Sequence, residues 1–439
     1  MSAVVCVSLR LIKYKKTQTI VQHMKTFISF DEALDLTLAH VFPGASEVLP
    51  LDELTGKILS EKIVAQVDSP SVTTSRKDGY AVVSSDLSRA TSENPVELVL
   101  VGHLSAGDIA DLQINGGQAV RVTTGAPLPQ GADAVLSEEY CEQSENAILA
   151  YNTAEEGRNI LERGTDIRLH EAVAAKGEKL LPALIGLFAS AGFDRAPVHK
   201  SPKIAVIASG DEVVAPGKPL PDGKLYASNM IEICSWLSLY GLSYVAVLVG
   251  DSKQEIKYAI TSHVSEADAF ITSGGAWGSE RDLILDVVED LSWQGVYRRV
   301  RMGPGKPVGF GLLEKKPFFI LPGGPPSNEM AFLQLALPAL MKMKGETSFS
   351  FPVIQAQLSE TVSGHKDWTQ FIHARLEKGK SKLIVKPAKL KSRLISMARK
   401  EALIIIPEGW EEWKAGEIIE IQLLNPEFPP LQLDINKAD

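Results

Sequence analysis

The chain has 439 residues, of which 45% are hydrophobic and 23% are charged, and its formal net charge at pH 7 is −9. A chain of this length exceeds the size at which one hydrophobic core keeps growing, so several domains are expected. The negative charge argues against nucleic acid as a partner, and no apolar run approaches the roughly 20 residues of a membrane span, which argues against a membrane protein.

The cysteines and the N-terminus indicate the compartment. Cys6, Cys141 and Cys234 show no metal-ligand spacing with one another or with the eight histidines. This usage is typical of a reducing cytoplasm and argues against structural zinc. The first residues, MSAVVCVSLRLIKYKK, place an apolar run before the positive charges, the reverse of a secretory signal. We interpret residues 1–25 as a disordered N-terminal extension or the product of an upstream start, with Met24 opening the folded part.

The next part of the chain predicts one helix, then many short strands, then a second helix. Residues 30–41 have the apolar spacing of a helix, with Ser29 and Glu32 as a capping box at its start. Residues 58–150 contain short β segments punctuated by glycine and proline, typical of a compact β-rich module. Residues 182–192 predict a short helix that opens at a proline and ends at a glycine.

Residues 203–341 alternate apolar strands with amphipathic helices. The strands are apolar throughout, as in KIAVIAS, which favours a parallel sheet covered on both faces. The helix that starts near residue 228 is expected to be capped by Ser228 or Asn229. From residue 346 the chain returns to β segments, which predict a small closed β domain. The predicted fold class is therefore multidomain, combining a parallel-sheet α/β domain, a β-rich inserted module and a C-terminal small β-barrel domain.

Four loops leave the carboxyl ends of the predicted parallel strands, where open α/β sheets bind ligands. They contain Ser209-Gly210-Asp211-Glu212, Gly250-Asp251, Ser273-Gly274-Gly275 and Pro322-Gly323-Gly324-Pro325. Glycine pairs let backbone N–H groups approach an anion, and carboxylates beside an anion require a divalent cation. Together they predict a Mg²⁺–phosphate site formed by Glu212, Asp251 and Asp282, with Arg298, Arg299, Arg301 and Lys306 nearby. Taken singly, each loop also has a structural interpretation, such as a helix N-cap for Asp251, a solvated acid for Glu212 and a turn for the glycine pair.

A basic stretch runs from Arg375 to Lys400, with Glu377 as its one acid. Such a stretch usually forms a solvated face. The functional alternative is that it attracts anions at the rim of an active site.

Several motifs occur in the order found in one known family. They are DGYAV at 78–82, RVTTGAPLPQGADAV at 121–135, GRNILERGTDI at 157–167, SGDEV at 209–213, SGG with Asp282, GPGKP at 303–307 and LPGGP at 321–325. On these motifs the chain resembles the MoeA-type molybdopterin molybdenumtransferases, whose eukaryotic relative is the E domain of gephyrin. The resemblance covers nearly the whole chain after Met24.

The resemblance implies five segments and a shared active site. They are the extension 1–25, a discontinuous linker and dimerisation domain of 26–68 and 157–200, the β-rich module 69–156, the α/β molybdopterin-binding domain 201–345 and the C-terminal β domain 346–439. The family forms homodimers with the site between the α/β domain of one subunit and the β-rich module of the other. With Mg²⁺ present, it inserts molybdate into adenylylated molybdopterin, a pterin nucleotide, and releases AMP.

The resemblance also assigns roles to residues of this chain. Asp78 and Thr124 would reach in from the β-rich module, while Glu212, Asp251 and Asp282 would hold the metal or the reacting groups. The residues expected to bind the pterin nucleotide are Ser209, Gly210, Gly274, Gly275, Trp277, Arg299, Lys306, Pro322, Pro325 and Ser327.

The chain departs from the family pattern in these same loops. Trp277 stands where a small hydroxyl residue is usual, Gly303 replaces a lysine, Gly324 replaces an asparagine and Ala227 replaces an aspartate. Thr165 and the Arg76-Lys77 pair also differ. Two interpretations follow: a working transferase with a rebuilt nucleotide pocket, or a catalytically silent paralogue that binds or senses a molybdenum-cofactor precursor. A gephyrin-like scaffold is a third possibility, but a long linker and a fused second enzyme domain are lacking.

Overall fold

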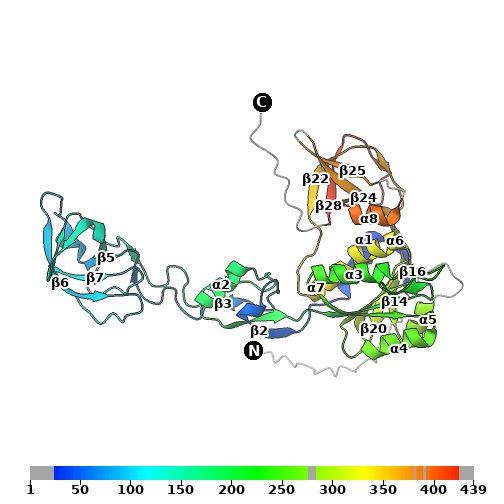
Figure 1. Ribbon diagram of the computed structural model, residues 1–439, viewed down its shortest axis with the longest axis horizontal. Coiled ribbons are helices and arrows are strands. Elements are labelled where there is room, and N and C mark those ends of the chain that lie inside the picture. Colours follow the sequence, from blue (N-terminus) through cyan, green and yellow to red (C-terminus); the bar gives the residue numbers. More distant parts are fainter. Residues whose placement is uncertain (1–23, 275–282, 380–381, 389–391, 425–439) are drawn as a thin grey trace, which may run out of the picture. The chain divides into compact units, whose positions relative to one another are not determined.

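The computed structural model describes residues 24–274, 283–379, 382–388 and 392–424. The chain divides into two compact units. The inserted unit comprises Pro43–Ser201 with Lys344–Thr347, and the α/β–barrel unit comprises the described residues up to Phe42, Pro202–Met343 and those from Ser348 onward. Figure 1 shows the ribbon, and each unit is described by itself. The predicted extension at residues 1–25 lies almost entirely outside the described residues.

A mixed sheet forms the α/β part of the α/β–barrel unit, in the order β17-β14-β18-β21-β20-β19, with β1 beside β19. Its strands are β1 (Lys25–Ser29), β14 (Lys203–Ser209), β17 (Ser243–Val249), β18 (Ala269–Ser273), β19 (Gln294–Gly303), β20 (Gly309–Leu313) and β21 (Lys316–Leu321). The predicted parallel arrangement is confirmed for β17, β14, β18 and β21. β20 runs antiparallel to both of its neighbours. The reason is that only Glu314 and Lys315, both with positive φ, separate β20 from β21, and a two-residue turn joins only antiparallel strands.

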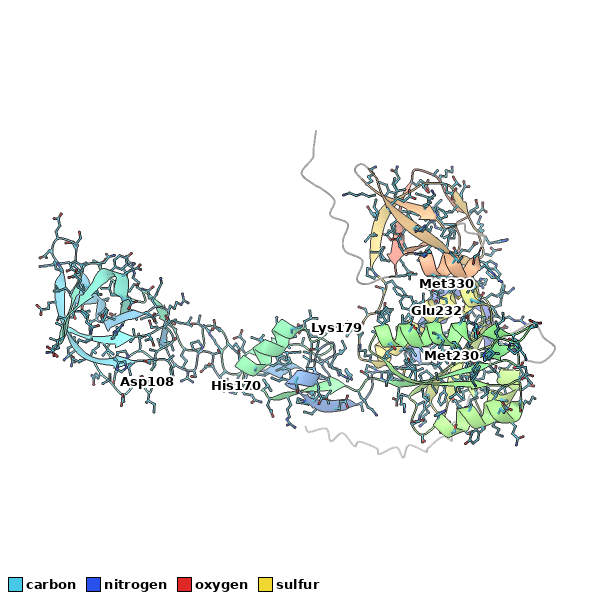
Figure 2. All side chains as sticks on the ribbon, viewed as in Figure 1. Asp108, His170, Lys179, Met230, Glu232 and Met330 are labelled. Atoms are coloured by element: carbon cyan, nitrogen blue, oxygen red, sulfur yellow. The ribbon has the colours of Figure 1, made fainter. Side chains whose placement is uncertain are left out.

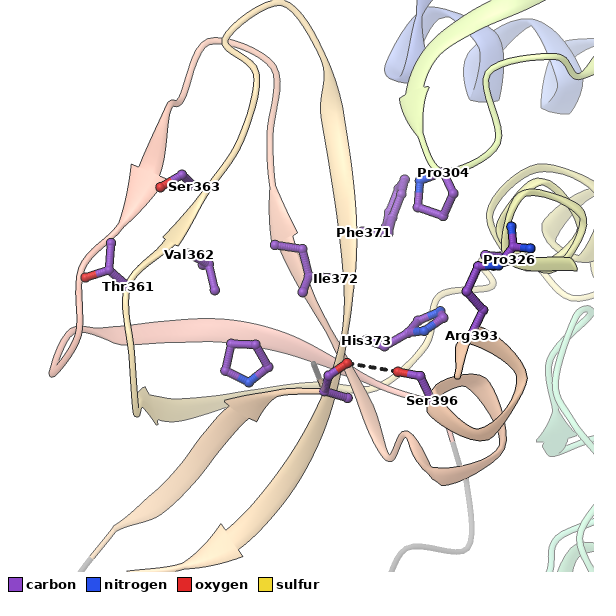
Figure 3. A pocket seen from close by; sticks show the side chains of 12 residues that line it. Pro304, Pro326, Thr361, Val362, Ser363, Phe371, Ile372, His373, Arg393 and Ser396 are labelled. Carbon is purple, nitrogen blue, oxygen red and sulfur yellow. Dashed lines mark hydrogen bonds between the residues drawn. The ribbon is translucent and has the colours of Figure 1, made fainter. Parts of the chain in front are cut away.

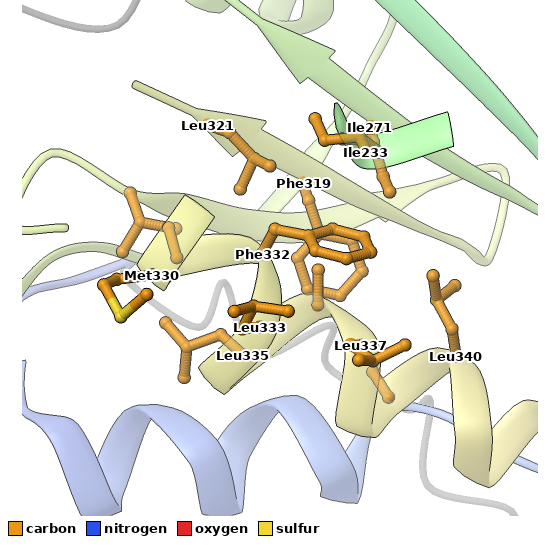
Figure 4. Packing of buried hydrophobic residues seen from close by; sticks show 14 of the residues in the cluster. Ile233, Ile271, Phe319, Leu321, Met330, Phe332, Leu333, Leu335, Leu337 and Leu340 are labelled. Atoms are coloured by element: carbon orange, nitrogen blue, oxygen red, sulfur yellow. The ribbon is translucent and has the colours of Figure 1, made fainter. Parts of the chain in front are cut away.

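Helices cover both faces of this sheet, as predicted. They are α1 (Phe30–Ala39), α3 (Ser228–Leu239), α4 (Lys253–His263), α5 (Leu283–Asp290), α6 (Pro325–Ala331) and α7 (Leu337–Met343), with a π-helical turn (Phe332–Ala336) joining the last two. Side chains alternate along β14, so that Ile204 and Val206 enter one core and Ala205 and Ile207 the other. Figure 4 shows Phe332 and neighbouring side chains packed against Phe319 of the sheet. The segment from Met330 to Leu337 is buried on all sides, which explains why every residue in it except Gln334 is apolar.

Of the two predicted helix N-caps, one is present in the structure and one is not. The Ser29 hydroxyl accepts a hydrogen bond from the Glu32 backbone N–H at 3.2 Å, which confirms the cap of α1. The prediction for α3 is wrong, because Ala227 occupies the N-cap position and its side chain makes no cap. Asn229 instead donates its amide to the Gly323 carbonyl at 2.8 Å, since another strand-end loop lies within its reach.

The C-terminal part of the α/β–barrel unit is a small closed barrel, as predicted. Its strands are β22 (Val353–Leu358), β24 (Thr369–Lys378), β25 (Leu383–Pro387), β26 (Ala402–Ile406) and β28 (Ile418–Leu423). It closes because β24 pairs with both β25 and β26, and apolar side chains such as Leu358 and Ile404 fill the interior. A short pair of β23 (Val362–Ser363) and β27 (Glu412–Trp413) and the helix α8 (Arg393–Arg399) complete it. β19 pairs with β24, which joins the barrel to the α/β sheet by backbone hydrogen bonds.

The inserted unit is mostly β structure, in agreement with the predicted β-rich module. A six-stranded sheet contains β5 (Gly79–Val82), β6 (Val96–Leu104), β7 (Gln118–Val122), β8 (Ala134–Ser137), β9 (Cys141–Gln143) and β10 (Ala147–Ala150). Shorter elements are β2 (Ser46–Pro50), β3 (Ile63–Val64), β4 (Thr74–Ser75), β11 (Ile160–Leu161), β12 (Ala172–Ala174), β13 (Arg195–His199) and the 3₁₀ turns Leu51–Glu53, Ser84–Leu87 and Glu138–Tyr140. The predicted helix is confirmed as α2 (Pro182–Ser190), which starts at its proline and ends shortly before Gly192.

All of α1, and β1 apart from its first residue Lys25, lie within the range 26–68 that was predicted as part of the linker and dimerisation domain. They pack here against β19 and α7 of the α/β–barrel unit. The remaining domain boundaries stay predictions. No helix among the described residues combines the length and the apolar character of a membrane span.

Candidate functional site

A cavity of about 510 Å³ lies at the carboxyl ends of β14, β18 and β21. The start of α3 and the two-stranded ribbon of β15 (Val213–Val214) and β16 (Leu225–Tyr226) form further walls. Of the predicted binding residues, Ser209, Gly274 and Pro325 line this cavity, and so does Glu212. Met230 of α3, labelled in Figure 2, contributes to its apolar wall. Three of the four predicted strand-end loops therefore meet at one cavity.

Two of the glycines lie in close contact with neighbouring atoms, with backbone at Gly274 and with side chains at Gly210. Gly274 has φ +105°, and a Cβ there would lie 2.4 Å from the Ser209 carbonyl oxygen, so the ends of β14 and β18 can approach only without a side chain. Gly210 has φ +152°, and a Cβ there would lie 2.7 Å from Glu212 Oε2. The Glu212 carboxylate thus lies over the Gly210 backbone.

The acids at the ends of β14 and β17 bind one another's backbone. The Asp251 N–H donates to Asp211 Oδ1 at 3.0 Å, and the Asp211 N–H donates to Asp251 Oδ2 at 3.3 Å. These reciprocal bonds hold two carboxylates together although like charges repel. Asp251 was predicted as a site residue, whereas Asp211 was not singled out although it stands beside Glu212 in the same loop.

Buried polar groups tie the strand ends to each other. Asn328, which is 2% exposed, donates its amide to Ser273 Oγ at 3.0 Å and to the Pro322 carbonyl at 2.8 Å. The Ser209 hydroxyl is buried beside the cavity and has no hydrogen-bond partner among the described residues. A buried polar atom without a partner is costly, and a bound ligand is one way to satisfy it.

The cations predicted for the anion side lie elsewhere. Neither Arg299 nor Lys306 lines the cavity. The Lys306 ammonium lies 5.0 Å from the ring centroid of Trp368 and 5.4 Å from that of Phe27, within cation–π range. Arg301, which the sequence analysis placed nearby, forms two hydrogen bonds with Glu408 Oε1.

Several predicted residues are structural here or fall outside the described residues. The Pro322 carbonyl accepts the Asn328 amide, and the Ser327 N–H donates to the Gly324 carbonyl at 3.0 Å at the start of α6. Gly275, Trp277 and Asp282 lie outside the residues that the structure describes. Within the described residues, no group of three or more histidine, cysteine, aspartate or glutamate side chains is close enough to hold a metal ion.

Asp78 and Thr124 form a pair in the inserted unit. Asp78 Oδ1 accepts the Thr124 backbone N–H at 2.6 Å and its hydroxyl at 3.0 Å. These bonds, the backbone one first, lower the pKa of Asp78 below its ordinary value, so the carboxylate stays ionised. The sequence placed the two residues 46 positions apart, and the structure brings them into contact.

A second cavity lies between the barrel and α6, with a buried charged cluster beside it. Pro304, Pro326, Phe371, His373 and Arg393 are among its lining residues (Figure 3). Behind it, the Lys400 ammonium is hydrogen-bonded to Glu329 Oε1.

The pKa values in this cluster are displaced from their ordinary values. Burial raises the pKa of Glu329 to about 8 against the lowering effect of Lys400, and neighbouring Glu232 adds to the rise. Burial and the Lys400 charge lower the pKa of His373 to about 4.

Arg393 also lines the strand-end cavity, together with Leu394. Arg393 belongs to the basic stretch from Arg375 to Lys400, and that stretch was the sequence signal for this particular cation.

Three family models match successive parts of the chain. The MoeA N-terminal region, domains I and II, matches residues 28–192; a probable molybdopterin binding domain matches residues 205–342; and the MoeA C-terminal region, domain IV, matches residues 355–424. Together the three matches run through the inserted unit, the α/β sheet and the barrel.

Full-length relatives and solved structures agree with these matches. A molybdopterin molybdenumtransferase from Staphylococcus epidermidis is 29% identical over 402 residues, which cover 91% of this chain and 96% of that protein. The protein of the same name from Haemophilus influenzae is 28% identical over 405 residues, which cover 91% of this chain and 99% of that protein. A crystal structure of a molybdopterin biosynthesis MoeA protein from Pyrococcus horikoshii has a TM-score of 0.81 at 30% identity and covers 91% of this chain and 99% of that one.

Proposed function

The chain belongs to the MoeA family, and from that premise we propose that it inserts molybdenum into molybdopterin, using adenylylated molybdopterin and molybdate and releasing AMP. The family and the transferase class predicted from the sequence motifs are confirmed by the relatives, which are named molybdopterin molybdenumtransferases. Molybdenum cofactor biosynthesis follows from the family, and the specific reaction with Mg²⁺ and AMP release is our proposal.

One observation supports the site most directly: three strand-end loops surround a cavity lined by a carboxylate, an arginine and a buried hydroxyl that has no partner in the described part of the chain. Glu212, Ser209 and Arg393 supply these groups, while residues such as Leu225 and Met230 supply apolar wall. A ligand with a flat ring system and an anionic part suits such a lining.

The carboxylates fit a magnesium ion in chemical type. Mg²⁺ prefers oxygen ligands and is commonly held by one or two carboxylates together with substrate phosphates. Glu212 and Asp251 would supply such oxygens, Asp211 lies beside Asp251, and Asp282 would complete the set. A bound magnesium ion would neutralise charge on the oxygens of molybdate and of the phosphoanhydride.

The remaining residues have roles that do not depend on the metal. Gly274 lets the ends of β14 and β18 approach each other closely, so that their loops meet at one cavity. We further propose that the protein is a homodimer, in which Asp78 and Thr124 serve the site of the other subunit. The contact between the two residues is consistent with this role, because two hydrogen bonds from Thr124 hold the Asp78 carboxylate in a fixed position.

The second candidate is a protein that binds the precursor without inserting metal. It is favoured by the loss of anion-binding side chains: Gly303 and Gly324 stand where the family pattern has lysine and asparagine. A Cβ at Gly324 would meet nothing within 4 Å, so packing does not require glycine there.

The two candidates are separated by incubating the purified chain with adenylylated molybdopterin, molybdate and Mg²⁺ and measuring AMP. We expect molybdate-dependent release, and we expect Asp251→Ala to abolish it while the dimer stays intact. Asp290→Ala, an exposed acid at the end of α5, is the matched control and should leave release unchanged. Tight binding of the substrate without any release would favour the silent paralogue.

A further inference from the structure

The charged groups that line the strand-end cavity are few. Among the described lining residues, Glu212 is the one acid and Arg393 is the one lysine or arginine. An anionic ligand in this cavity therefore has a single permanently charged partner in the described part of the chain. That partner comes from the barrel, whereas most of the wall comes from the α/β sheet and its loops.

Arg393 is held in position by the fold around it. It is the first residue of α8, whose start is capped by the Ser392 hydroxyl accepting the Ile395 N–H at 3.3 Å. The Ser396 hydroxyl donates to the Ala388 carbonyl at 2.9 Å, which fixes the buried side of the helix (Figure 3). The Arg393 side chain reaches toward Pro326 at the start of α6, next to Pro325 of the cavity wall (Figure 3).

The Arg393 guanidinium is available for a ligand. Arg393 is exposed and makes no hydrogen bond or ion pair within the described residues, unlike Arg301, which binds Glu408. An exposed guanidinium without an ion-pair partner among the described residues has its five donors available for solvent or an anion. Leu220, Leu225 and Leu394 form an apolar part of the cavity wall.

We propose that Arg393 is a substrate-binding residue that contacts a phosphate group of the ligand and makes this cavity selective for phosphorylated over unphosphorylated ring compounds. The inference rests on the proposed function in that it takes the substrate to be a nucleotide. Arg393 supplies the planar, always charged donor that phosphate recognition requires, at the place where Arg299 and Lys306 do not reach.

The test uses the full-length protein with AMP and adenosine as probes, which differ only in the phosphate. By titration calorimetry we expect the wild type to bind AMP at least about tenfold more tightly than adenosine, since charge-assisted hydrogen bonds are worth about 1.5–3 kcal/mol. Arg393→Gln should weaken AMP about 10- to 100-fold and leave adenosine within about twofold. Arg393→Lys should lie between the two, because it keeps the charge and loses the planar donor pair.

Arg375→Gln is the matched control. Arg375 is exposed on β24, and its replacement removes the same charge from the barrel without touching either cavity, so its AMP affinity should match the wild type. The inference is overturned if Arg393→Gln binds AMP as the wild type does, if it loses AMP and adenosine equally, or if the wild type does not prefer AMP.

This result is independent of the release assay. If AMP release fails but Arg393→Gln removes the preference for AMP, the proposed function is wrong and the role of Arg393 stands. If release proceeds and the preference is unchanged by the variant, the proposed function stands and the role of Arg393 is wrong.

Discussion

Two groups of charged residues in the α/β–barrel unit differ in where they lie and in what holds them. Asp211, Glu212 and Asp251 are exposed at the ends of β14 and β17, and two of them bind each other's backbone N–H groups. Glu329 is 2% exposed between α6 and the barrel, where it meets Lys400 and His373. The carboxylates of the first group are free to bind a cation. The one carboxylate of the second group, Glu329, is already engaged by Lys400 inside the protein.

Burial separates the acids that can serve function from those that serve stability in this unit. Exposed acids are screened by water, so their loss costs little folding free energy. Buried charges are strongly desolvated, so removing one partner leaves the other uncompensated. We therefore expect substitutions in the two groups to have different effects on stability: large for the buried group and small for the exposed group.

The largest effect is expected for Glu329→Gln. It leaves the Lys400 ammonium, 6% exposed, without its carboxylate and should lower the free energy of unfolding by about 3–5 kcal/mol. Chemical denaturation at pH 9, above the raised pKa of Glu329, where its carboxylate is ionised, measures this change. Glu377→Gln in the exposed pair with Lys386 is the control and should cost less than about 1 kcal/mol.

A double variant sharpens the same point. Glu329→Gln with Lys400→Met removes both charges and should recover most of the lost stability, since a buried pair is often replaceable by uncharged side chains. A double variant as unstable as the single one would contradict the account, because the loss would then come from packing.

The next effect is a pH dependence assigned to His373. Its folded-state pKa of about 4 lies below the ordinary 6.5, so between these values the unfolded chain binds the proton and the folded protein does not. The contribution of His373 to the free energy of unfolding is fully present above pH 6.5. It is lost as the pH falls toward 4, by up to about 3 kcal/mol. The pKa of Glu329 is raised, so its contribution to stability falls as the pH rises, opposite to that of His373. Wild type and His373→Gln both contain Glu329, so the difference between them reports the histidine. The difference in unfolding free energy between wild type and variant should shrink on acidification; a constant difference would refute the assignment.

A smaller effect is expected at the strand ends. Asp211→Ala removes the acceptor of the Asp251 N–H, but water can replace it at this exposed position, so the stability should fall by less than about 1 kcal/mol. Thermal unfolding at constant pH measures it. A loss of stability comparable with that of Glu329→Gln would contradict the claim that the exposed acids contribute little to stability.

The smallest effect concerns the inserted unit, where Asp78 is also exposed but is bonded to a neighbour. Thr124→Val keeps the backbone donor and removes the hydroxyl, so the pKa of Asp78 should rise part of the way toward its ordinary value. NMR titration of the carboxylate measures this. An unchanged pKa would mean that the backbone bond alone lowers it.

The parts of the fold that could be predicted are those in which capping residues and the spacing of apolar residues indicate the same element. Ser29 and Pro182 mark the starts of α1 and α2, and the uninterrupted apolar strands identify a sheet covered on both faces. The antiparallel β20 was missed, because the turn residues Glu314 and Lys315 are neither glycine nor asparagine and so give no hairpin signal.

The site was predictable as a set of loops but less so as a set of side chains. Asp211 and Glu212 are adjacent acids, and only the folded backbone shows that the first meets Asp251 while the second lies over Gly210 and lines the cavity. Arg393 is one cation in a basic stretch, and its position beside the cavity depends on the closure of the barrel and the placement of α8. Trp277 lies outside the described residues, so its role remains a prediction.

The pairing of β1 with β19 also bears on how the protein is made. A ribosome delivers residues 25–29 early, yet the strand that receives them, Gln294–Gly303, emerges only after nearly the whole inserted unit. The nascent chain must therefore hold an unpaired strand while the inserted unit becomes able to fold on its own. Vectorial synthesis would then complete the α/β sheet only after the inserted unit has been made, when its first strand pairs with a partner synthesised hundreds of residues later.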